Sequence, residues 1–272
     1  MLKEQETIFK QINKAVQIFT ASDGKLRPHF FLTGPSGSGK SHLAAYVAEQ
    51  NDLGIIEINA AQLTKEGVSG NSLSKALAPL AQCSNRLTIV FIDEFDKLFI
   101  TGNNNSELAH ESTTAVQNEF LRVLESKTTS IFGDYGKYNN VAVDKTLFIF
   151  AGAFNGEENL TLDRLRELGV KTEFLGRVGL IYNLSKLSID SMRAALVNSK
   201  LLENYLKLFP KAKRDKCIED IMVQIEKTFE QNTLGIRVIN TLLHQYFING
   251  GKLTEDQVNK TTFTKTLELN NE

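Results

Sequence analysis

Cysteine is scarce in this chain of 272 residues. Its two cysteines, Cys83 and Cys217, lie far apart, and neither belongs to a Cys-x-x-Cys pair. This spacing argues against a disulfide framework and against a cysteine-based zinc site. We therefore expect a cytoplasmic protein, kept in a reducing compartment, that is long enough to be stabilised by a packed core.

Net charge and long apolar runs are also lacking. The chain has 31 Lys and Arg against 32 Asp and Glu, so no overall basic field indicates nucleic-acid binding. The longest apolar runs, near residues 87–92 and 147–154, are far shorter than the roughly 20 residues that cross a bilayer. Charges interrupt the apolar pattern of residues 1–19. We expect neither a membrane span nor a targeting segment.

Apolar strand patterns alternate with helical patterns through the first two thirds of the chain. Such alternation favours parallel strands joined by right-handed crossovers. After residue 184 only helical patterns remain. We predict an α/β domain over residues 1–184 and a small helical domain over residues 185–272. The expected strands are 29–33, 54–59, 88–92, 146–151 and 181–184, and the expected helices are 7–19, 41–50, 72–82, 112–126, 188–208, 213–231 and 234–249.

A glycine-rich segment follows the first expected strand and opens a helix. It satisfies the pattern G-x-x-x-x-G-K-[ST], in which glycines allow successive backbone N–H groups to point at phosphate oxygens. The lysine reaches the β- and γ-phosphates of a nucleotide, and the hydroxyl that follows it ligates Mg²⁺. The segment predicts a nucleotide site made by Gly34, Pro35, Ser36, Gly37, Ser38, Gly39, Lys40 and Ser41, with His42 as the next candidate contact.

Two carboxylates end the apolar strand of residues 87–94. A buried strand has no use for adjacent acids unless they face a cation or a reacting water. Asp93 fits the carboxylate on the Mg²⁺ side, and Glu94 fits the base that polarises the attacking water. The Asp-Glu pair favours a hydrolase over a kinase, because a kinase must exclude water.

Five further segments resemble AAA+ ATPases, and specifically the ClpX/HslU branch of protein-unfolding ATPases. They match the acidic strand end, the helix after it, the strand that leads to the first sensor, the arginine-finger segment and the second-sensor segment. Their order and spacing agree from about Phe30 to Phe247. In the order just given, the segments are 91–97, 115–125, 147–154, 172–177 and 234–237.

The resemblance implies a ring, usually a hexamer, with ATP and Mg²⁺ bound between neighbouring subunits. It implies that Arg177 reaches the γ-phosphate held by the next subunit, and that Arg237 contacts the nucleotide of its own subunit. Asn155 stands near the first-sensor position, where the alternative is an asparagine that merely caps a loop.

The chain departs from the branch in places that bear on its role. Val68 stands where the unfoldases carry the aromatic residue of a pore loop that grips polypeptide. Only residues 155–171 separate two segments between which the branch carries its protease-docking loop. The zinc-binding N-terminal domain is not seen, and no adenine-flanking motif is recognisable. We therefore expect no protease chamber as a partner.

Three roles stay open. The first is a ring motor that remodels a protein substrate or one dedicated partner without a protease. The second is a DNA-associated AAA+ regulator or loader. The third is a switch in which ATP controls assembly. A basic cluster either touches nucleic acid or is a solvated helix start; it comprises Lys211, Lys213, Arg214 and Lys216.

Overall fold

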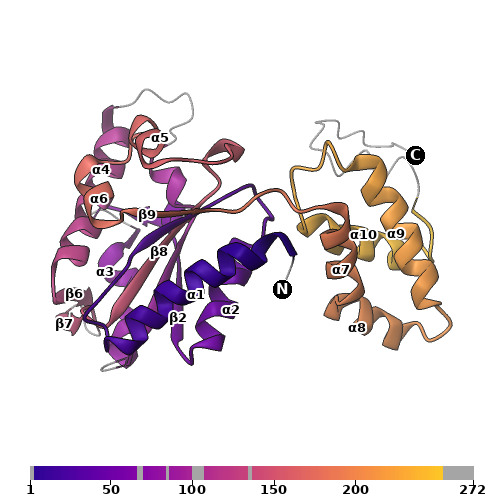
Figure 1. The fold of residues 1–272 in the computed structure, drawn as a ribbon, viewed down its shortest axis with the longest axis horizontal. Helices are drawn as coiled ribbons and strands as arrows, with labels where there is room; N and C mark the ends of the chain where they lie inside the picture. Colours follow the sequence, from indigo (N-terminus) through magenta and orange to yellow (C-terminus); the bar gives the residue numbers. More distant parts are fainter. Residues whose placement is uncertain (1–2, 66–69, 84–85, 100–106, 134–136, 254–272) are drawn as a thin grey trace. The chain divides into compact units, whose positions relative to one another are not determined.

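The computed structural model describes residues 3–65, 70–83, 86–99, 107–133 and 137–253, with only the backbone course given for 107–113 (Figure 1). The chain divides into two compact units. One, the sheet unit, comprises Gln5–Pro35 and Gly39–Ser185. The other, the helical unit, comprises the described residues of Met1–Glu4, Ser36–Ser38 and Lys186–Glu272.

A five-stranded sheet forms the centre of the sheet unit. Its strands run in the order β2-β5-β8-β1-β9, and every neighbouring pair is parallel. The carboxyl ends of all five strands therefore meet at one edge. The strands are β1 (Phe30–Thr33), β2 (Gly54–Asn59), β5 (Thr88–Asp93), β8 (Thr146–Gly152) and β9 (Leu180–Asn183).

Helices cover both faces of this sheet, because successive side chains of a buried strand point to opposite faces. In β8, Leu147 and Ile149 pack with α1 (Glu6–Ala21) and α2 (Lys40–Gln50), which lie side by side (Figure 1). Phe148 and Phe150 pack on the other face. That face is covered by the elements α3 (Leu73–Ala76), α4 (Glu107–Glu125), α5 (Leu162–Glu167) and α6 (Thr172–Arg177).

Aromatic rings fill the core on the α4 side. Phe95 is fully buried in η4 (Phe95–Leu98), directly after the acidic end of β5. Its ring contacts those of Phe31, Phe99, Phe120, Phe150 and Phe174. The strand end that carries the two carboxylates is thus anchored by a large apolar side chain.

The helical unit has its own core. It contains α7 (Ile189–Val197), α8 (Lys200–Leu208), α9 (Arg214–Thr228) and α10 (Arg237–Ile248), whose apolar faces form one cluster. The single helix expected over residues 188–208 is wrong in detail. Two helices occupy it, because Ser199 caps a new helix by accepting a hydrogen bond from the Leu202 N–H at 3.3 Å.

Two more expectations need correction. The helix expected over 72–82 stops at Ala76 and continues as the 3-10 segment η3 (Ala78–Cys83), which contains Pro79. The sequence also did not predict an antiparallel hairpin of β6 (Thr128–Phe132) and β7 (Tyr138–Ala142). The remaining short elements are η1 (Lys3–Gln5), η2 (Ala60–Gln62), β3 (Leu63–Thr64), β4 (Asn71–Ser72) and η6 (Phe154–Gly156).

The predicted fold class is otherwise confirmed: a parallel α/β core is followed by a helical part. Within the described ranges, no helix combines the length and the apolar character that a membrane crossing requires.

Candidate nucleotide-binding site

The glycine-rich loop leaves β1 at the carboxyl edge of the sheet and opens α2. Gly39 is the N-cap of α2 and has a left-handed backbone with φ of 89°. A Cβ atom at this position would lie 2.6 Å from Nε2 of the buried Gln5. The left-handed backbone favours glycine at position 39, because any other side chain there would be strained. The turn leaves the first N–H groups of α2 available to an anion.

Lys40 is the first residue of α2, and its side chain is buried. Its Nζ donates hydrogen bonds to the carbonyl oxygens of Gly34 at 2.7 Å and Pro35 at 3.0 Å. The ammonium group is therefore held against the loop that it follows. A positive charge placed beside a curved loop of backbone N–H groups suits a phosphate chain.

The acidic end of β5 faces the start of α2. The Ser41 hydroxyl donates to Asp93 Oδ2 at 3.4 Å, and the Glu94 N–H donates to Asp93 Oδ1 at 2.9 Å. Glu94 itself is exposed and has a left-handed backbone with φ of 54°, which is uncommon outside glycine. The structure thus brings together Lys40, Ser41, Asp93 and Glu94.

The neighbouring strand β8 ends in a second unusual turn. Phe154 is fully buried, and both Phe154 and the exposed Asn155 have positive φ. Asp96, which is 1% exposed, accepts a hydrogen bond from the Ala153 N–H at 3.2 Å. A buried carboxylate therefore joins the segment after β5 to the segment after β8. The sequence reasoning missed Asp96, although it lies inside the quoted motif.

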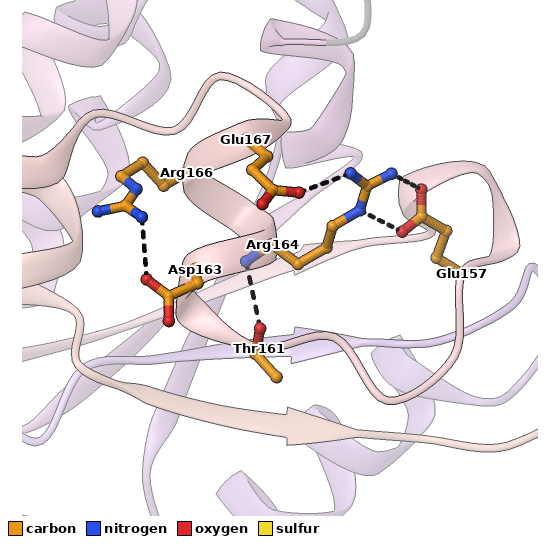
Figure 2. A network of polar contacts seen from close by, with 6 residues as sticks. All are labelled: Glu157, Thr161, Asp163, Arg164, Arg166 and Glu167. Carbon is orange, nitrogen blue, oxygen red and sulfur yellow. Dashed lines mark hydrogen bonds and ion pairs between the residues drawn. The ribbon is translucent and has the colours of Figure 1, made fainter.

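Polar contacts also hold the segment after Asn155 (Figure 2). Arg164 Nε and Nη2 each lie 2.7 Å from a Glu157 carboxylate oxygen, and Nη1 lies 2.8 Å from Glu167 Oε2. Hydrogen bonds to Glu157 and then Glu167 raise the pKa of Arg164. Thr161 caps α5 by accepting from the Arg164 N–H at 3.2 Å. A compact, internally paired turn thus follows Asn155.

Arg177 belongs to the sheet unit. It ends α6, and its Nη2 lies 2.8 Å from Oε1 of Glu125, the last residue of α4.

The helical unit holds Arg237 and the loop residues Ser36–Ser38. Arg237 is exposed at the start of α10, and its Nη1 lies 3.3 Å from the Ser36 hydroxyl of the same unit. The Ile236 N–H donates to the Gly37 carbonyl at 3.2 Å, and Ser38 is buried. In the sheet unit, His42 is exposed on α2. The pore-loop position, Val68, lies outside the described residues.

A buried histidine supports β8 from the end opposite to the candidate site. His29 precedes β1, and its Nδ1 accepts a hydrogen bond from the Phe148 N–H at 3.0 Å. Burial, together with the positive charge of Arg27, lowers the pKa of His29 to about 3. The ring is therefore neutral at pH 7 and serves the fold.

The donors at the loop suit Mg²⁺ held in part by a substrate. Magnesium in proteins is often bound by one or two carboxylates together with substrate phosphates, rather than by an all-protein cage. Ser41 and Asp93 supply such a partial set. Within the described ranges, no group of three or more His, Cys, Asp or Glu suited to a metal occurs.

Comparison with known families then decides the class. Residues 30–167, about half of the chain, match the family described as "ATPase family associated with various cellular activities (AAA)". The chain belongs to the AAA family. This AAA domain begins at β1 and extends to the end of α5, so it includes the loop, the acidic strand end and the turn after β8.

Curated relatives of this AAA protein are named "ATP-dependent Clp protease ATP-binding subunit ClpX". The protein of Bacteroides thetaiotaomicron is 24% identical over 87% of this chain and 68% of its own length. That of Porphyromonas gingivalis is 25% identical over 80% and 65%. That of Treponema denticola is 30% identical over 61% and 42%. The chain is thus ClpX-like, as predicted, and spans about two thirds or less of the relatives' length.

Proposed function

We propose that this protein binds and hydrolyses ATP in a Mg²⁺-dependent manner at the carboxyl edge of its sheet. The observation that carries the proposal is the approach of the Ser41 hydroxyl to Asp93 at 3.4 Å, beside Lys40 and Glu94. Residues from β5 and α2 converge there although they are about 50 positions apart. The AAA family assignment supports the same chemistry.

Each residue has a distinct task in this proposal. Lys40 and the N–H groups of residues 34–39 bind the phosphates, and Ser41 and Asp93 hold the metal directly or through water. Mg²⁺, when bound, supplies positive charge to the phosphate oxygens. Glu94, whose side chain is exposed next to Asp93, orients a water and accepts its proton.

The site is proposed to be completed by a second subunit of a homo-oligomer, a hexameric ring. Arg177 points its charge to the γ-phosphate in the neighbouring subunit, and Arg237 contacts the nucleotide of its own subunit. Asn155 is the proposed first-sensor residue. The working domains are 1–184 and 185–272, and ATP turnover changes the angle between them.

The substrate class is proposed to be protein. The curated relatives carry the name of a Clp protease subunit, which supports a remodelling activity. The turn that follows Asn155 is short and closed by the Arg164 contacts, which supports action without a protease chamber. The composition favours the cytosol as the compartment.

A Glu94→Gln protein tests this function. We expect it to bind ATP but to hydrolyse it about 100-fold more slowly, because the water loses its base. With ATP and Mg²⁺ its mass should become that of a closed ring, and six chains of 30.4 kDa give about 182 kDa. Glu49→Gln, an exposed change on α2, is the matched control and should hydrolyse ATP normally.

Duplex DNA then separates the protein and DNA alternatives. A closed ring without DNA, whose turnover is stimulated by an unfolded protein, would support the remodeller. Assembly only on DNA, in variable lengths, with an ATPase rate that falls steeply with salt, would show instead that DNA is the ligand. Unchanged turnover in Glu94→Gln would remove Glu94 from its role.

A further inference from the structure

Two helices of the sheet unit end beside each other and bring opposite charges together. Glu125 is the last residue of α4, and Arg177 is the last residue of α6, 52 positions later. Arg177 Nη2 lies 2.8 Å from Glu125 Oε1. The two side chains are 55% and 48% exposed, so water and other molecules reach both of them.

The contact with Glu125 involves only one nitrogen of the Arg177 guanidinium group. A guanidinium has five N–H donors in a planar fork. Among the described residues, the Glu125 contact is the one ion pair of Arg177, and it involves a single nitrogen. Because the Arg177 side chain is 55% exposed, its other donors are accessible to solvent. Glu125 therefore orients the arginine without using up its capacity to bind phosphate.

Arg164 shows the opposite arrangement in the same unit (Figure 2). All three of its guanidinium nitrogens face carboxylate oxygens, two against Glu157 and one against Glu167. The guanidinium nitrogens of Arg164 are therefore all paired within the chain, and the role of this arginine is to hold the turn together. Arg164 is thus fixed in a structural role, whereas Arg177 is held at one nitrogen and keeps other donors available for a ligand.

Glu125 is placed where a carboxylate is otherwise unfavourable. The carboxyl end of a helix carries partial negative charge, which repels a side chain of the same sign. α4 is 19 residues long, and Glu125 stands at that end. The nearby cation of Arg177 offsets this repulsion. The ion pair thus has a local electrostatic reason as well as a geometric one.

We propose that Glu125 is the positioning residue of Arg177, holding its guanidinium in the orientation in which it meets the γ-phosphate of a neighbouring subunit. This inference rests on the proposed function. A long arginine side chain has many rotamers, and fixing one of them before ATP arrives lowers the entropic cost of reaching the transition state. In this proposal Glu125 contacts neither ATP nor the attacking water, and it acts through Arg177.

The test is steady-state ATP hydrolysis by the full chain. Glu125→Ala should lower kcat about 3- to 10-fold and leave KM for ATP within about twofold, because the effect lies in the transition state. The matched control is Glu49→Ala, which removes the same charge from the last turn of α2 at an exposed residue without an ion pair to the described residues. The control should retain the wild-type kcat. Thermal melting should show both variants folded.

A double variant separates positioning from a general effect. Arg177→Ala together with Glu125→Ala should be no slower than Arg177→Ala alone, because Glu125 has nothing left to orient. Independent, multiplying losses would overturn the inference. So would a Glu125→Ala protein that matches Glu49→Ala in kcat.

The same kinetic data distinguish failure of the proposed function from failure of the positioning role of Glu125. If Arg177→Ala hydrolyses ATP like the wild type, the arginine does not act across subunits, and the proposed function fails in that respect. If Arg177→Ala is slow while Glu125→Ala is normal, the proposed function stands and only the positioning role of Glu125 is refuted.

Discussion

Acid should destabilise this protein through His29. The ring is 6% exposed, and its Nδ1 accepts the Phe148 N–H at 3.0 Å. A proton on Nδ1 would place a charge in the core and turn the acceptor into a donor that faces another donor. Burial first, and the charge of Arg27 second, therefore lower the pKa of His29 from 6.5 to about 3.

The sign and size of the effect follow from proton linkage. Because the folded pKa lies below the unfolded one, the unfolded chain binds the proton more readily between pH 3 and pH 6.5. The stabilisation is complete above pH 6.5 and decreases as the pH falls toward 3. One group then costs about 2 kcal/mol of unfolding free energy between pH 7 and pH 5, and about 5 kcal/mol in full.

Urea unfolding at pH 7 and pH 5 measures this loss. The chain has no tryptophan, so far-UV circular dichroism is the suitable signal. His29→Asn is the matched control, because its Oδ1 still accepts the Phe148 N–H but does not titrate. We expect the wild type to lose about 2 kcal/mol more than this variant between the two pH values. Equal losses would refute the assignment of the acid sensitivity to His29.

The remaining predictions concern the site and its support. Lys40→Ala should weaken ATP binding more than about 10-fold in calorimetry, since a charge-assisted contact to phosphate is removed; normal affinity would contradict the phosphate site. Asp96→Ala should cost about 1 to 3 kcal/mol in urea unfolding, because the Ala153 N–H loses its acceptor; unchanged stability would count against that bond. Phe95→Ala should cost about 3 to 5 kcal/mol, as it empties the centre of the ring cluster, and a loss under 1 kcal/mol would contradict this packing.

Elements with strong apolar periodicity were predictable from the sequence. The five strands of the sheet and the helices α1 and α2 were expected within a few residues of their observed bounds, whereas α5 and α6 were not predicted. The β6–β7 hairpin was missed because its largely exposed strands, 128–132 and 138–142, lack a regular alternation of apolar residues. The break between α7 and α8 was missed because a single capping serine decides it.

The candidate site divides in a similar way. The loop of residues 34–41 and the acids Asp93 and Glu94 carry their chemistry in a local pattern, so the sequence indicated them. The partners Glu125 and Asp96 carry no such signal. Asp96 reaches a backbone N–H 57 positions away, and Glu125 reaches an arginine 52 positions away. Only the fold makes these pairs.

The strand order has a consequence for how the protein is made. Among the described strands, β1 pairs only with β8 and β9. More than a hundred residues must therefore be synthesised after β1 before its first neighbouring strand exists. At ribosomal speed this interval is roughly 6 to 20 s. Throughout it the apolar sequence Phe30-Phe31-Leu32 of the nascent chain has both edges open. β9, the last strand of this sheet to be synthesised, completes the sheet by pairing with β1, the first.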